Sequence, residues 1–168
     1  MTPPREAPGF RGLSHLTPAG DARMVDVSAK AETVREAVAH ATLKMKGATL
    51  AAIQAGQLAK GDVLGVARTA GIMAAKRTPD LIPLCHPLRI TSVDIEFVLD
   101  ARKSVVTVQA RVRTVDKTGV EMEALTAAAV AGLTVYDMVK AVDRGVVLTD
   151  LGLIEKSGGK SGHWKRAR

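Results

Sequence analysis

Two neighbouring segments of this 168-residue chain alternate apolar and polar residues, and this pattern narrows the possible folds more than any other feature. Residues 93–99 alternate Val, Ile, Phe and Leu with Asp and Glu, and residues 106–112 alternate Val and Ala with Thr, Gln and Arg. A two-residue period is typical of strands that bury one face. With residues 100–103 as the loop, the pattern predicts a β-hairpin whose apolar face needs a covering layer.

Helices are predicted on both sides of this hairpin. Asp62 can cap a helix over residues 63–76, which ends before Pro79 because the residue preceding a proline disfavours helical geometry. Its expected inner face consists of Val63, Val66, Ala67, Ala70 and Met73. A longer helix is predicted over residues 121–142 and a short one over residues 50–55.

Further strands are predicted over residues 24–28 and 146–154, whereas residues 33–45 are ambiguous. In the ambiguous segment, a helical stripe would consist of Val34, Ala37, Val38 and Ala41. The alternation of a strand would instead place on one face Ala37, Ala39, Ala41, Leu43 and Met45. We expect one α+β domain over residues 23–162, with a flexible arm over residues 1–22 and a frayed basic tail over residues 163–168.

Composition excludes several classes of protein. No stretch approaches the roughly 20 apolar residues of a membrane span, and the single cysteine cannot form an internal disulfide, so a cytosolic protein is expected. The net charge of +7 favours phosphate-rich partners. Aromatic residues make up only 2% of the chain, which argues against the stacking surfaces of single-strand nucleic-acid binders.

Asp137 and Lys140 lie three residues apart on the predicted long helix, and therefore on one face of it. One interpretation is a surface ion pair that contributes under about 1 kcal/mol to stability. The other is a partly buried pair tuned for proton transfer, since the preceding turns are rich in alanine. The pattern alone leaves both open.

Other ionisable groups allow similar alternatives. Glu121 and Glu123 can either complement the helix dipole or accept hydrogen bonds from the N–H groups of a ligand. His86 can be a pocket residue or a structural one, and alternation along an extended segment separates it from Cys85, which argues against a nucleophile–base pair. Cys85 itself is expected to be a small buried residue.

The glycine-rich run from Lys156 to Gly162 ends in a Gly-Lys-Ser sequence but is not a Walker loop, because Ile154 occupies the position of the required first glycine. Its two lysines, Lys156 and Lys160, could still contact phosphates. Lys60 could be an ordinary loop lysine. The histidines show no metal-ligand spacing, so we expect no tightly bound metal.

Five segments carry a resemblance to a known family: residues 24–28, 76–88, 117–126, 136–140 and 156–162. In this order they are similar to the cyclic pyranopterin monophosphate synthases of molybdenum cofactor biosynthesis, from about residue 13 to residue 162. The resemblance implies a lyase that converts (8S)-3′,8-cyclo-7,8-dihydroguanosine 5′-triphosphate to cyclic pyranopterin monophosphate and diphosphate. Mg²⁺ could accompany the triphosphate.

The resemblance also implies roles and an assembly. Asp137, Lys60 and Lys140 match the acid–base core, and a second set matches substrate-binding positions: Leu84, Cys85, His86, Glu121, Met122, Glu123, Arg35, Lys156 and Lys160. It implies a ferredoxin-like antiparallel sheet packed against helices, with residues 33–45 as a strand, and a homohexamer built as a trimer of dimers. A non-catalytic nucleotide-sensing or RNA-binding module is the rival hypothesis. It predicts binding that weakens steeply with salt and tolerates loss of Asp137.

Overall fold

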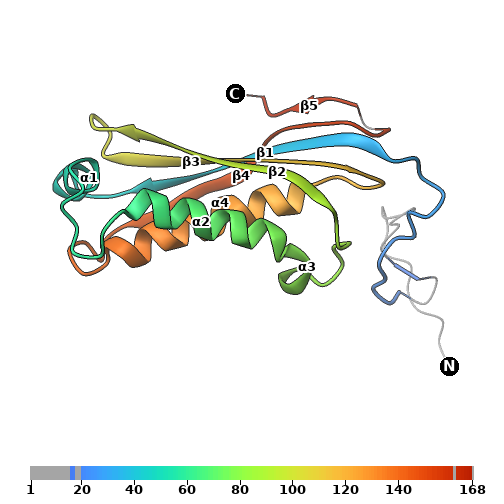
Figure 1. Cartoon of the computed structure of the whole chain (residues 1–168), viewed down its shortest axis with the longest axis horizontal. Helices are drawn as coiled ribbons and strands as arrows, with labels where there is room; N and C mark the ends of the chain where they lie inside the picture. The colour runs from blue at the N-terminus through green and yellow to red at the C-terminus, as the bar shows by residue number, and fades with distance from the viewer. Residues whose placement is uncertain (1–15, 18–19, 161, 168) are drawn as a thin grey trace.

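A computed structural model describes residues 16–17, 20–160 and 162–167 of the chain, and Figure 1 shows their arrangement. In chain order the elements are β1 (Thr33–Lys44), α1 (Gly47–Gln54), α2 (Val63–Lys76), α3 (Thr78–Leu81), β2 (Ile90–Asp100), β3 (Val105–Asp116), α4 (Glu121–Val139), β4 (Val147–Ser157) and β5 (Trp164–Lys165). The strands form one antiparallel sheet in the order β2-β3-β1-β4-β5. Helices α2 and α4 cover one face of it (Figure 1).

This topology confirms the α+β prediction and has the ferredoxin-like order, with β1 and β3 in the centre of the sheet. Residues 33–45 were ambiguous by pattern, and the structure places nearly all of them in the strand β1. The strand pattern prevails over the helical one because β1 is hydrogen-bonded to a neighbouring strand on each edge, β3 on one side and β4 on the other. Its inward residues Ala37, Ala39, Ala41 and Leu43 are at most 1% exposed beneath the helices.

Helix α2 begins as predicted, with the Asp62 carboxylate accepting a hydrogen bond from the Gly65 N–H at 2.9 Å. Its predicted inner face is partly wrong, since Val66 is 45% and Met73 51% exposed. The residues that pack inward are Val63, Ala67, Gly71, Ala74 and Ala75. Gly71 lies so close to α4 that a Cβ there would be 3.1 Å from the Ala127 carbonyl, so small residues rather than large ones set this interface.

Helix α4 is long and apolar enough to span a membrane by length and composition alone. Half of that stretch is buried, and it packs against α2 and the sheet, as expected of a core helix. It ends at Val139 rather than at residue 142. Asp143 follows in the turn, where its carboxylate accepts hydrogen bonds from the Lys46 N–H and the Thr49 hydroxyl, both at 2.9 Å.

Two local predictions are wrong. Residues 24–28 form no strand, because no neighbouring strand pairs with them, although Val25 and Val27 both line one pocket. The expected frayed tail is paired in part, since Trp164 and Lys165 form β5 along the edge of β4. Most of the expected N-terminal arm, residues 1–15, lies outside the described residues.

Candidate functional site

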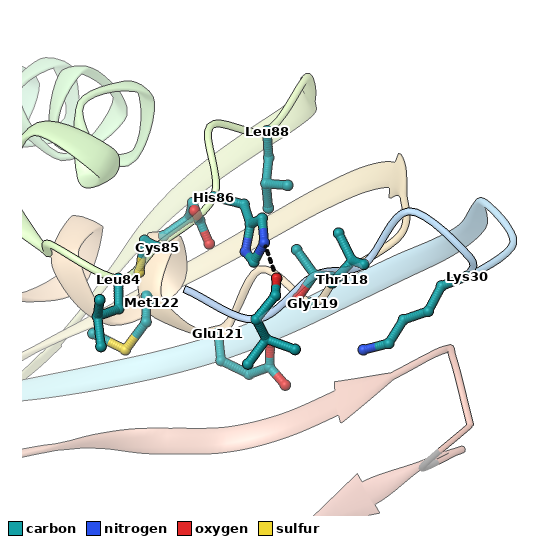
Figure 2. A pocket seen from close by; sticks show the side chains of 12 residues that line it. Lys30, Leu84, Cys85, His86, Leu88, Thr118, Gly119, Glu121 and Met122 are labelled. Atoms are coloured by element: carbon teal, nitrogen blue, oxygen red, sulfur yellow. Dashed lines mark hydrogen bonds between the residues drawn. The ribbon is translucent and has the colours of Figure 1, made fainter. Parts of the chain in front are cut away.

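A pocket of about 240 Å³ lies at the N-terminal end of α4 (Figure 2). Three segments meet there: residues 25–30, the stretch between α3 and β2, and the turn that leads into α4. Its lining includes six residues assigned to substrate binding from the sequence, Leu84, Cys85, His86, Glu121, Met122 and Glu123. The structure therefore brings these six residues together in one pocket, and their roles in substrate binding stay predictions.

His86 is fixed by a hydrogen bond across the pocket, drawn as a dashed line in Figure 2. Its Nε2 lies 2.8 Å from the Val25 carbonyl oxygen, which can only accept, so Nε2 carries the proton. Cys85 lines the same pocket, contrary to the expected opposite orientation, because residues 85–89 do not form a regular strand. Burial, and then the nearby Glu123 carboxyl, raise the pKa of the Cys85 thiol, which keeps it protonated and a poor nucleophile.

Glu123 is a buried acid in the wall of the pocket, with only 2% of its surface exposed. Burial raises its pKa from 4.5 to about 7, its own backbone N–H opposes that rise, and Glu121 adds to it. Glu121 is neutralised by Lys156, whose ammonium lies 2.8 Å from its carboxylate. The two glutamates therefore differ: Glu121 is paired with a lysine, whereas Glu123 exists in both protonation states near neutral pH.

Two basic side chains, Lys30 in the pocket lining and Arg35 beside it, form what we call its basic rim. Arg35 on β1 donates from Nε and Nη2 to the carbonyls of Asp116 and Lys117, both at 3.0 Å. These partners are neutral, so they orient the guanidinium without cancelling its charge. Lys30 lines the pocket from the N-terminal segment, and Figure 2 shows its side chain extending toward it.

A second cluster lies at the C-terminal end of α4. The Asp137 carboxylate is 2.9 Å from Lys60 Nζ and 2.6 Å from Lys140 Nζ. Lys60, from the loop between α1 and α2, also donates to the Asp137 backbone carbonyl at 2.7 Å. The structure thus brings together the three residues assigned to acid–base chemistry, two of which are 77 positions apart in the sequence.

The electrostatics of this cluster are those of a charged triad. Lys140 and then Lys60 lower the pKa of Asp137 to about 2, and Asp137 in turn raises the pKa of Lys140. Of the two interpretations that the sequence left open, the isolated chain fits the surface ion pair, because about half of each side chain is exposed, 54% for Asp137 and 52% for Lys140. Carboxylate and ammonium forms therefore coexist at neutral pH.

The two clusters lie at opposite ends of one helix. Sixteen residues separate Glu121 from Asp137 on α4, a rise of about 24 Å along the helix axis. Figure 1 shows α1, near the triad, and the N-terminal segment, near the pocket, at opposite ends of the molecule. The pocket and the lysine–aspartate cluster are therefore two separate sites within one chain.

Several residues that line the pocket were not assigned from the sequence, and one assigned residue, Lys160, does not line it. Val25, Val27 and Lys30 line the pocket, but no sequence pattern pointed to Lys30, and residues 25 and 27 were interpreted as strand positions. The alternation of Val25 and Val27 with polar neighbours was the sequence feature from which their shared place in the pocket could have been predicted. Lys160 is exposed and lies next to the glycines that approach Arg35. Among the described residues, no group of three or more His, Cys, Asp or Glu side chains could hold a metal ion.

Fold and pockets together define a ferredoxin-like α+β protein with a basic-rimmed pocket and a separate lysine–aspartate cluster. The chain belongs to the MoaC family, whose model matches residues 24–159. It is 60% identical to the cyclic pyranopterin monophosphate synthase of Heliobacterium modesticaldum over 92% of this chain and 97% of that protein. Proteins of the same name from Thermomicrobium roseum (57% identity, 92% and 93% coverage) and a Roseiflexus species (59%, 89% and 95%) are also similar to it.

Proposed function

We propose that this chain is a cyclic pyranopterin monophosphate synthase, a lyase of molybdenum cofactor biosynthesis. It converts (8S)-3′,8-cyclo-7,8-dihydroguanosine 5′-triphosphate to cyclic pyranopterin monophosphate and releases diphosphate. The observation that carries the proposal is the pairing of a basic-rimmed pocket with a Lys60–Asp137–Lys140 cluster in a chain 60% identical to a relative of that name. The reaction needs both parts, an anion-binding pocket and groups that transfer protons.

The pocket suits the base of the substrate. Glu123 is almost fully buried and has a pKa of about 7, so it can accept a hydrogen bond from a ring N–H or, when protonated, donate one. His86, held by Val25, and Met122 contribute further walls. A site with few, fixed polar groups among apolar ones gives orientation as well as affinity.

The rim suits the phosphates. Arg35 is oriented by two carbonyls, and Lys30, Lys156 and Lys160 lie on neighbouring segments. Cations of this kind stabilise the negative charge that develops on a departing diphosphate. Lys156 is now paired with Glu121, and a phosphate can compete for its ammonium group.

The triad suits proton transfer. With a pKa of about 2, Asp137 is ionised at neutral pH, so in this arrangement it aligns the two ammonium groups and receives a proton only transiently. Lys60 and Lys140 are the proton donors in this proposal, and the raised pKa of Lys140 keeps it charged between turnovers. Positioned acids and bases of this kind contribute about 10²–10⁴-fold to a rate.

We further propose that a complete site combines two chains, within a homohexamer built from dimers. The rise of about 24 Å between the two clusters along α4 supports a shared site, because the clusters of one chain lie far apart. In the proposed assembly, the triad of one chain meets the pocket of another. Large apolar side chains on the outer faces of the helices, Val66 and Met73 of α2 and Leu133 of α4, are 45–55% exposed and are available for such contacts. We also propose a cytoplasmic location, with no resident cofactor and with Mg²⁺ arriving on the triphosphate.

Subunit mixing tests the composite site. His86→Ala should disable the pocket and Asp137→Asn the triad, so each variant alone should be nearly inactive. If each site draws on two chains, mixed dimers contain one intact site, and random reassociation should restore about a quarter of the wild-type activity. No recovery after verified subunit exchange would show that both clusters act within one chain.

Turnover tests the function itself. Wild-type protein should convert the cyclised dihydroguanosine triphosphate to a product with the mass of cyclic pyranopterin monophosphate. Lys103→Ala removes a surface ion pair at the β2–β3 turn and serves as the active control. Tight, strongly salt-dependent RNA binding without turnover would instead support the binding-module hypothesis.

A further inference from the structure

The C-terminal strand β5 pairs with β4 beside a proposed phosphate-binding lysine. Lys156 lies opposite Trp164 in the register, and Glu155 lies opposite Lys165. The Arg166 N–H extends the pairing by donating to the Ile154 carbonyl at 2.8 Å. The backbone that carries Lys156 is therefore held on both of its edges, by β1 and by β5.

Side chains of the same segment fix this pairing. The Glu155 carboxylate is 2.7 Å from His163 Nε2 and 3.7 Å from Lys165 Nζ, so one acid binds two residues of the tail. The Arg166 guanidinium lies directly over Gly152, where a Cβ would overlap it. The absence of a side chain at position 152 is thus what lets Arg166 lie against β4.

The two glycines that follow β4, Gly158 and Gly159, lie against Val34 and Arg35. Gly158 and Gly159 have positive φ angles, +97° and +69°, a conformation that other residues rarely adopt. A Cβ on Gly158 would overlap the Val34 carbonyl, and one on Gly159 would overlap the Arg35 guanidinium. A glycine-rich backbone has a large conformational entropy when it is free. Attaching it on each side therefore lowers the entropy that is lost when a ligand binds.

We propose that the segment from His163 to Arg166 is a positioning element for phosphate binding: by pairing with β4 it holds Lys156, and the glycine backbone that contacts Arg35, in the conformation that receives the phosphates of the substrate. This rests on the proposed function for the identity of the triphosphate. The segment itself touches no reacting atom. Its loss should weaken binding of phosphate groups and leave the lysine–aspartate triad, at the far end of α4, unchanged.

Glu155→Gln is the decisive variant, because simple electrostatics and positioning predict opposite results. The substitution removes a negative charge, so a purely electrostatic role of the tail predicts tighter binding of anions. It also releases His163 and Lys165, so positioning predicts weaker binding. We expect the Kd for inorganic triphosphate, measured by titration calorimetry, and the KM for the substrate to rise at least threefold, with kcat within about twofold of wild type.

A chain ending at Gly162 should show the same split more strongly, with KM raised about tenfold. Lys103→Ala, which removes a surface ion pair at the β2–β3 turn, should change neither constant. The inference is overturned if Glu155→Gln binds inorganic triphosphate as well as or better than wild type, if its kcat falls while KM stays constant, or if wild type does not bind inorganic triphosphate. If the shortened chain does not fold, Glu155→Gln decides alone. If wild type binds triphosphate but never turns over the substrate, the proposed function fails and the binding comparison still decides this inference.

Discussion

Glu123→Gln should change the pH dependence of stability, because the Glu123 carboxyl is almost completely buried in the pocket wall. Its pKa rises from 4.5 to about 7 in the folded chain, mainly through loss of hydration. The folded protein therefore holds the proton more tightly than the unfolded chain. The associated stability is fully present below about pH 4.5 and is lost as the pH rises through about 7.

The size of the effect follows from the shift. A change of about 2.5 pKa units at about 1.4 kcal/mol per unit corresponds to about 3 kcal/mol over the full range, most of it between pH 5 and pH 8. Glutamine has nearly the same shape and cannot ionise. The variant should thus gain stability relative to wild type as the pH rises, by about 2–3 kcal/mol between pH 5 and pH 8.

Urea unfolding of both proteins at several pH values measures this difference directly. Comparing the two proteins at each pH cancels the contributions of the other carboxylates, such as Asp137, whose pKa is lowered. If the difference in unfolding free energy between variant and wild type is constant from pH 5 to pH 8, Glu123 does not titrate in this range. The reasoning from its burial would then be wrong.

Four further substitutions give separate tests. Asp137→Asn should keep the circular dichroism spectrum of wild type, because the side chain is 54% exposed. Its kcat should fall at least about 10²-fold in a diphosphate-release assay. A near-normal rate would show that Asp137 takes no part in the chemistry. Lys60→Ala should fold normally and lose turnover, and retained turnover would refute its assignment. Arg35→Lys cannot reproduce both bonds to the Asp116 and Lys117 carbonyls, so KM should rise about tenfold, whereas an unchanged KM would place the phosphates elsewhere. Leu43→Ala should lower the unfolding free energy by about 2–5 kcal/mol, because Leu43 is fully buried on β1. A smaller loss in urea titrations would contradict the place of Leu43 in the core.

Local patterns were sufficient for much of the fold. The hairpin β2–β3 follows from alternation, and the start of α2 follows from the Asp62 cap. β1 could not be assigned from its own residues, because its alanines fit both periods and only the bonding to β3 and β4 on either side decides. The exposure of Val66 and Met73 was equally beyond prediction, since the small residues Gly71 and Ala127 determine which face of α2 meets α4.

The candidate site shows the same division. The local pattern placed Cys85 and His86 on opposite sides of an extended segment, whereas the family resemblance assigned Leu84, Cys85 and His86 to one pocket, which all three line. The family resemblance supplied the link between Lys60 and Asp137, which spacing alone could not, because 77 residues separate them. Lys30 carried no local signal at all. Its place in the pocket depends on how an irregular N-terminal segment lies against the rest of the chain.

The most direct test of the proposed function is to incubate the purified protein with (8S)-3′,8-cyclo-7,8-dihydroguanosine 5′-triphosphate and to measure diphosphate and cyclic pyranopterin monophosphate together over time. We expect both products to appear in equal amounts and at the same rate, and neither to form at a comparable rate with Asp137→Asn. Diphosphate without the cyclic product would indicate simple hydrolysis. If neither product forms while the protein is folded and the substrate intact, the chain does not catalyse the proposed reaction.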